Sequence, residues 1–142
     1  MLRTPPALAA AALAVAAGAG AAQPPQEAAA ERYAAGRAVH EQVCAACHSL
    51  DPPPREAPPV RGVSRQLHRH FDSAEAAVAF VSEYLVAPSA ERAVCDRRAI
   101  ERFGVMPALP LPEAQREDAA FFFWRYWEVA PPPARPGRGT GR

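Results

Sequence analysis

The stretch VCAACHSL, residues 43–50, places two cysteines and a histidine within five positions. Cys44 and Cys47 stand three apart, and His48 follows directly. Thiols at this spacing form a redox disulfide, bind a metal ion or form covalent bonds to a cofactor, and the imidazole adds a nitrogen ligand. If a helix continues through the motif, the three side chains lie at i, i+3 and i+4 and share one face.

Cys-x-x-Cys-His is the signature of c-type haem attachment. In this interpretation Cys44 and Cys47 form thioether bonds to the porphyrin, and His48 binds the iron. The motif therefore predicts one covalently bound haem c. A zinc module built from the two cysteines and two histidines is an alternative. A thiol–disulfide exchanger is another, although the chain lacks the βαβ context in which such motifs usually occur.

A second axial ligand is expected from Met106, the methionine that remains once Met1 is removed with a leader. It lies in FGVMPAL, a loop framed by glycine and proline, where Pro107 has no backbone donor and stiffens the segment. The alternative is a labile Met106 that leaves the iron open to small gases or peroxide. His68 and His70, in the polar stretch LHRHF, are expected on the surface rather than on the iron.

Other residues with reactive or charged side chains have simpler explanations. Cys95 is expected in a helix as a small buried residue, with intermolecular pairing or a redox-active thiol as alternatives. Arg97, Arg98 and Arg102 would pair with haem propionates or form a solvated helix face. His40 is expected on the solvated flank of the first helix.

The chain of 142 residues suits one domain. Residues 1–22 resemble a secretory signal peptide, which predicts export to the periplasm; an uncleaved membrane anchor is the alternative. Residues 23–30 are expected to form a linker and the start of the first helix, and 31–129 the folded domain. Residues 130–142, rich in proline, glycine and arginine, are expected to form a disordered tail.

Charge excludes one class of partner. The sixteen basic residues are all arginine and face fifteen acidic residues, so the net charge is only +1. A near-neutral chain without a basic field is not expected to bind nucleic acid.

Helical periodicity predicts an all-α fold, since no segment is typical of a strand. A proline-rich loop is expected at 51–59. Asp72 is expected to cap the second helix and Pro88 to end it, while Ser89 and Gly104 bound the third and Pro112 starts the last. The expected helices are 27–43, 72–87, 89–103 and 112–129.

Three stretches together resemble a monohaem class I cytochrome c: AAGRAVHEQVCAACHSL, APPVRGV and FGVMPALPLPEAQREDAAFFFWRYW. The resemblance covers residues 31–129. It implies a cytochrome c-like helical domain around one covalently attached haem. It also implies one-electron transfer as a free carrier or as a subunit of an oxidoreductase complex, with redox proteins as partners and no enzymatic activity of its own.

The resemblance assigns further roles. Gly36 matches the small residue where the first and last helices of the family cross, with Phe122 or Phe123 packed against it. Pro58 matches the proline whose carbonyl accepts a hydrogen bond from the ligand histidine, and Val60 matches an apolar residue against the ring. His40 departs from the family, which frequently has leucine or phenylalanine there.

Overall fold

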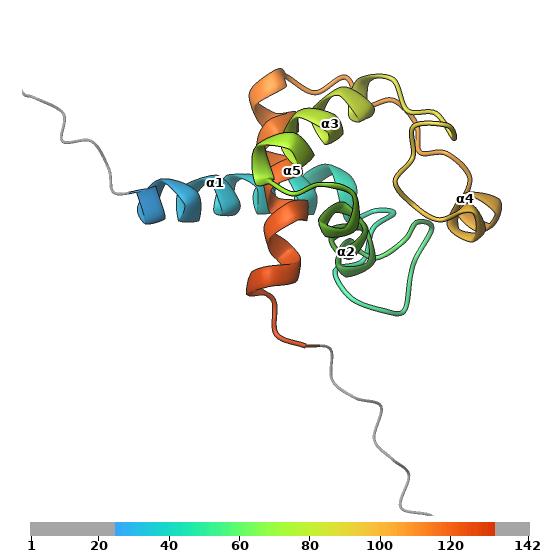
Figure 1. Cartoon of the computed structure of the whole chain (residues 1–142), viewed down its shortest axis with the longest axis horizontal. Helices are drawn as coiled ribbons and strands as arrows, with labels where there is room; N and C mark the ends of the chain where they lie inside the picture. The colour runs from blue at the N-terminus through green and yellow to red at the C-terminus, as the bar shows by residue number, and fades with distance from the viewer. Residues whose placement is uncertain (1–24, 133–142) are drawn as a thin grey trace, which may run out of the picture.

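A computed structural model of the protein describes residues 25–132. This part is all-α, as predicted, and contains no β-strand (Figure 1). The signal peptide predicted at 1–22, residues 23–24 and most of the predicted tail lie outside the described residues. The elements are α1 (Pro25–Val39), η1 (His40–Cys44), α2 (Val60–His70), α3 (Ala74–Val86), α4 (Arg97–Phe103) and α5 (Glu113–Val129).

The last helix, α5, forms the centre of the fold, and α1, α2 and α3 all pack against it. Its aromatic block is covered on several sides, as expected of a helix that is apolar around most of its circumference. The buried aromatic residues are Phe121, Phe122, Phe123, Trp124 and Tyr126. From the other helices Val60, Leu67 and Ala77 complete the core.

Helices α1 and α5 cross steeply and in very close contact (Figure 1). A Cβ atom on Gly36 would lie 1.9 Å from the backbone oxygen of Asp118 and 2.7 Å from Cβ of Phe122. Both distances are far below van der Waals contact, so only glycine permits this approach. The expected role of Gly36 at the crossing is confirmed, with Phe122 as its partner.

The first helix ends earlier than predicted. Regular α-helix stops at Val39 and continues as the π-helical turn η1, in which the Ala45 amide donates to the His40 carbonyl over 2.8 Å. The chain then turns, and the His48 amide still bonds the Cys44 carbonyl over 2.8 Å. Cys44 and His48 therefore keep the one-turn spacing that the sequence predicted, although the α-helix does not reach them.

Helix α2 was not predicted. It begins after Pro59 and buries Val60, Ser64 and Leu67, which lie at i, i+4 and i+7 on the side of α5. This spacing after two prolines is a helix signal. It was hidden by the polar residues Arg61, Arg65 and Gln66, which stand between the buried apolar positions.

Two predicted helix starts are wrong. The cap of α3 is Ser73 rather than Asp72, because the Ser73 hydroxyl accepts from the Ala76 amide over 3.2 Å. Ser89 caps only a single turn, and α4 begins seven residues later than expected for a helix starting at 90. There the Asp96 carboxylate accepts from the Ala99 amide over 2.8 Å. Aspartate is a strong N-cap in extended backbone, so it ends the preceding loop and starts a new helix.

The remaining boundaries agree with the sequence. Gly104 ends α4 with a positive φ of 74°, a conformation that glycine adopts without a steric penalty. Pro112 immediately precedes α5.

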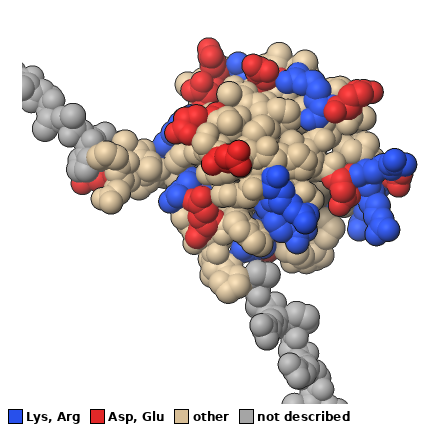
Figure 2. Space-filling view, in the orientation of Figure 1, with Lys and Arg blue, Asp and Glu red and all other residues tan. Residues whose placement is uncertain are grey.

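On the face drawn in Figure 2, arginine and acidic side chains are interspersed over the surface. Among the helices that the structure describes, none combines the length and the apolar character required to cross a lipid bilayer.

Candidate functional site

An apolar pocket of about 240 Å³ is lined by residues of every element from η1 to α5. Protein interiors are close-packed, and a dry cavity of about 150 Å³ is already large enough to bind benzene. The pocket is therefore larger than a packing defect. Its apolar walls include Leu67, Phe80, Leu85, Ile100, Phe103 and Phe123.

The pocket collects most of the residues that the sequence singled out. Cys44, Cys47, His48 and Met106 all line it, and so does Pro58. They come from two parts of the chain, the end of η1 with its following loop and the loop after α4.

Val60 is placed differently. It does not line the pocket but is fully buried in the core. Val63, one helical turn further along α2, lines the pocket in its place. The structure does not place Val60 where a ring in this pocket would lie, because the start of α2 puts it in the core with Phe122 and Trp124.

The imidazole of His48 is oriented by the chain itself. Its Nδ1 lies 2.7 Å from the Pro58 carbonyl oxygen, which confirms the predicted hydrogen bond. A carbonyl only accepts, so Nδ1 carries the proton and Nε2 has a lone pair. Nε2 makes no hydrogen bond within residues 25–132. Burial lowers the pKa of His48 below its ordinary 6.5, so the ring is neutral at pH 7 and Nε2 is available as a ligand.

A series of backbone hydrogen bonds, here called the proximal clasp, joins residues 47–50 to residues 57–61. Two of its donors are amides at the start of α2, which have no partner inside the helix. The clasp therefore caps α2 and fixes Pro58 beside His48. Its bonds run from Ala57 to Cys47 over 3.1 Å, from Val60 to Ser49 over 2.8 Å and from Arg61 to Leu50 over 3.1 Å.

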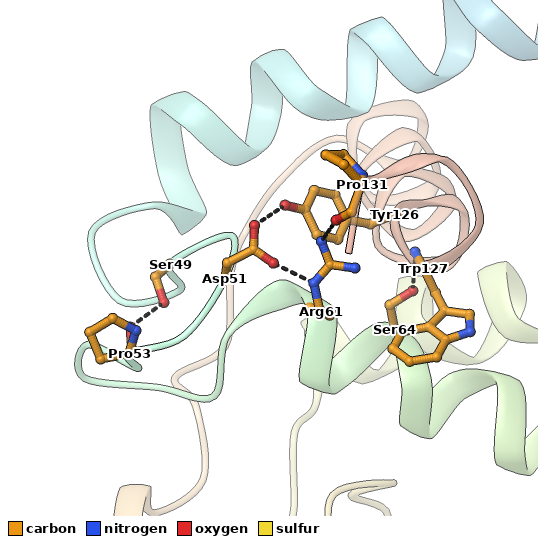
Figure 3. A network of polar contacts seen from close by, with 8 residues as sticks. All are labelled: Ser49, Asp51, Pro53, Arg61, Ser64, Tyr126, Trp127 and Pro131. Atoms are coloured by element: carbon orange, nitrogen blue, oxygen red, sulfur yellow. Dashed lines mark hydrogen bonds and ion pairs between the residues drawn. The ribbon is translucent and has the colours of Figure 1, made fainter. Parts of the chain in front are cut away.

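A buried polar network ties the clasp to α5 (Figure 3). Arg61 is only 8% exposed, and its guanidinium donates to the Asp51 carboxylate and to the Pro131 carbonyl. The Tyr126 hydroxyl donates to the same carboxylate over 2.9 Å. Burial, together with the bond to Asp51, raises the pKa of Tyr126 to about 12. A buried guanidinium with these two partners holds three segments in one arrangement.

His40 is not on a solvated flank, so that prediction was wrong. The residue is 2% exposed, and its ring packs against Phe122 and Phe123. Its Nε2 lies 3.0 Å from the His48 carbonyl oxygen. The signal was present in the sequence, because His40 lies four residues after Gly36 and therefore shares the face that meets α5.

Residues 93–108, here called the distal segment, line the pocket from the other part of the chain. Its pocket-lining residues include Val94, Cys95, Ile100, Phe103 and Met106. No residue from 86 to 118 is buried. Within the described chain every hydrogen bond of the distal segment stays inside the segment, and it is anchored just beyond its end, where the Leu109 amide donates to Leu85 over 2.8 Å.

Cys44 and Cys95 do not have the features of exchange-active thiols. All three cysteines are free, and Cys95 lies in a bend before α4 rather than in a helix, which corrects that expectation. Burial raises the pKa of Cys44 to about 11 and also raises that of Cys95. A thiol–disulfide exchanger needs a thiolate at neutral pH. These environments therefore disfavour that alternative.

The zinc alternative lacks a ligand cluster, since within residues 25–132 no three or more His, Cys, Asp or Glu side chains converge to hold a metal ion. His68 stacks on Trp124 at 3.7 Å between ring centroids, and His70 is exposed. Neither histidine lines the pocket. Arg97, Arg98 and Arg102 are exposed and also lie outside its lining.

No model of a known protein family matches the chain, and no solved structure matches it. Among curated proteins, an uncharacterised protein of Aquifex aeolicus (strain VF5) is similar. It is 28% identical over 108 residues, which cover 64% of this chain and 71% of that protein.

Proposed function

We propose that the chain is a periplasmic monohaem c-type cytochrome that transfers single electrons. One observation carries the proposal: a single apolar pocket is lined by the two motif cysteines, a histidine nitrogen with a free lone pair and the Met106 thioether. This donor set fits a haem c, with Cys44 and Cys47 as thioether anchors and His48 and Met106 as axial ligands. The proposed fold class is that of the class I cytochromes c.

When bound, haem c supplies an iron that alternates between the ferrous and ferric states. The chain positions the group and controls its surroundings. The bond to Pro58 holds His48 in the tautomer that a metal requires, and the apolar walls of the pocket exclude water. Ligation by His48 and Met106 would leave no position for a substrate, which suits a carrier rather than an enzyme. A thioether ligand also raises the reduction potential relative to a second imidazole.

The proposed partners are a donor and an acceptor redox protein, which meet the chain as a free carrier or within an oxidoreductase complex. Residues 1–22 support export of the chain, and any association with a membrane depends on whether that leader is retained.

A second candidate function is supported by the distal segment. Met106 belongs to a stretch whose hydrogen bonds to the rest of the described chain are confined to its flanks. A weakly held Met106 would leave the iron and open a site for small gases or peroxide.

The proposal is tested on protein exported from a host equipped for cytochrome maturation. We expect the intact mass to include one haem and the ferric spectrum to contain a sulfur-to-iron charge-transfer band. Met106→His should abolish that band and lower the midpoint potential. His70→Gln, which removes an exposed histidine outside the pocket, should change neither.

The outcomes separate the candidates. A colourless protein without added mass would refute haem attachment. A coloured wild-type protein that lacks the sulfur band and readily binds carbon monoxide would support the gas or peroxide function instead.

A further inference from the structure

His40 occupies a position that an apolar residue would fill well. It is buried between η1 and α5, with its ring centroid 5.3 Å from Phe122 and 6.0 Å from Phe123. Burying an imidazole there removes two polar nitrogens from water, and each one destabilises the fold unless it finds a hydrogen-bond partner.

Only one of the two nitrogens has a partner. Nε2 lies 3.0 Å from the His48 carbonyl oxygen, and because a carbonyl only accepts, Nε2 is the protonated nitrogen. Nδ1 is buried and unpaired within the described part of the chain. An unpaired buried acceptor is unfavourable, and a phenylalanine at this position would avoid it. The imidazole of His40 makes the hydrogen bond to the His48 carbonyl, and an apolar side chain would not make it.

This bond fixes His48 at a second point. Pro58, in the loop before α2, accepts from the His48 ring, while His40, in η1, donates to the His48 backbone. The Phe123 ring meets the His48 ring edge-on at 5.7 Å and also contacts His40. The peptide group and the ring of His48 are therefore restrained separately, from two elements, and together they set the direction of Nε2.

We propose that His40 is a positioning residue, which holds the backbone of His48 from within the core and so orients the proximal imidazole towards the haem iron. The inference rests on the proposed function, since His48 acts there as an iron ligand. It goes beyond that function by assigning a second restraint, made by a residue that replaces the usual apolar side chain at this position.

The test uses side chains that imitate each nitrogen separately. In His40→Gln the amide nitrogen stands near the place of Nε2 and restores a donor to the His48 carbonyl. In His40→Asn the amide nitrogen stands near the place of Nδ1 and does not reach it. His40→Phe removes both nitrogens and keeps the ring. All three are made in the haem-loaded Met106→Ala protein, whose ferrous iron keeps His48 as its protein ligand.

The measurement is the iron–imidazole stretching band in the resonance Raman spectrum. We expect one narrow band with His40 or Gln, and a shifted, broadened band with Phe or Asn. The proton concentration that breaks the iron–His48 bond should fall about tenfold in His40→Phe, the lower end of the usual effect of removing such a supporting contact. Thermal unfolding should show His40→Phe to be at least as stable as its parent, because the unpaired nitrogen is gone.

An unchanged band and acid midpoint in His40→Phe would overturn the inference, as would equal behaviour of the Gln and Asn variants. If the intact mass shows no haem, the proposed function fails separately. In that case the hydrogen bond between His40 and the His48 carbonyl is tested in the colourless protein, through the NMR signals of the His48 ring. Ring signals that move in Phe and Asn but not in Gln support the restraint, and signals that do not move in any variant refute it.

Discussion

Residues 40–61 and residues 93–108 both line the pocket, but they are held in different ways. The first segment bonds across itself through the proximal clasp, to α5 through the Asp51–Arg61–Tyr126 network and to the core through His40. The distal segment has none of these bonds. Its polar ties to other elements lie at its flanks, and in Figure 1 α4 stands apart from the other helices.

The difference indicates which side of the pocket is held in place by hydrogen bonds within the polypeptide. His48 is oriented by bonds that exist in the polypeptide alone, so its side of the pocket is preorganised. Ile100, Phe103 and Met106 line the pocket and none of them is buried. Their packing energy therefore depends on what the pocket contains.

The largest expected effect comes from the frame that supports the preorganised side. Gly36→Ala would place Cβ 1.9 Å from the Asp118 backbone oxygen, so α1 and α5 must separate. We expect a loss of at least about 3 kcal/mol in the free energy of unfolding, measured by urea denaturation.

Gly62→Ala is the matched control, because its Cβ would lie at ordinary contact distances of 3.7 and 3.8 Å from the Pro59 ring. We expect no loss there, and a gain of up to about 1 kcal/mol from the better helix former. Equal destabilisation of the two variants would show that the crossing is looser than described.

The next effect compares the core with the distal segment. In a Cys44→Ala, Cys47→Ala chain, which cannot attach haem, Leu67→Ala should cost about 3 kcal/mol, since Leu67 is fully buried. Ile100→Ala should cost less than about 1 kcal/mol, since no residue of α4 is buried. Urea denaturation of both variants measures the difference. Similar costs would mean that the distal segment is packed as firmly as the core.

The smallest effect concerns pH and the buried network. The pKa of Tyr126 is raised from about 10 in the unfolded chain to about 12 by burial and by Asp51, so the folded state keeps this proton longer. The resulting stability, on the order of 2 kcal/mol, is complete below pH 10 and is lost as the pH rises towards 12. Denaturation at a series of pH values measures it.

Tyr126→Phe is the control for that titration. The free energy of unfolding of this variant should be about 1 kcal/mol lower at pH 8, because the hydrogen bond to Asp51 is gone. Between pH 10 and pH 12 its stability should fall less than that of the wild-type protein, because it lacks the Tyr126 hydroxyl. A decline of the same size in both proteins would assign it to other tyrosines.

Features encoded by neighbouring residues were the predictable ones. The closeness of Cys44 and His48, the glycine that ends α4 and the proline before α5 depend on spacing or local backbone geometry, and the structure places them as expected. The hydrogen bond from His48 to Pro58 was predicted only from the resemblance to a family.

Features made by distant residues were missed. Tyr126 meets Asp51 and Arg61 across a long stretch of chain, and nothing in their local sequence indicates the network. Helix α2 was missed for the same reason. Its buried face is short, and that face is recognised only from its packing against α5. Helix α1 ends at Val39 because a π-helical turn follows, and the hydrophobic periodicity of the sequence did not indicate that turn.

The crossing at Gly36 also has a consequence for the order of folding. It joins one of the first described helices to the last, so the domain has to wait for nearly its whole length to be synthesised before α1 can dock. Contacts of such long range slow folding. During that delay the sulfurs of Cys44 and Cys47 are carried by an open chain, and under the proposed function a maturation apparatus would have time to reach both before the pocket forms around them.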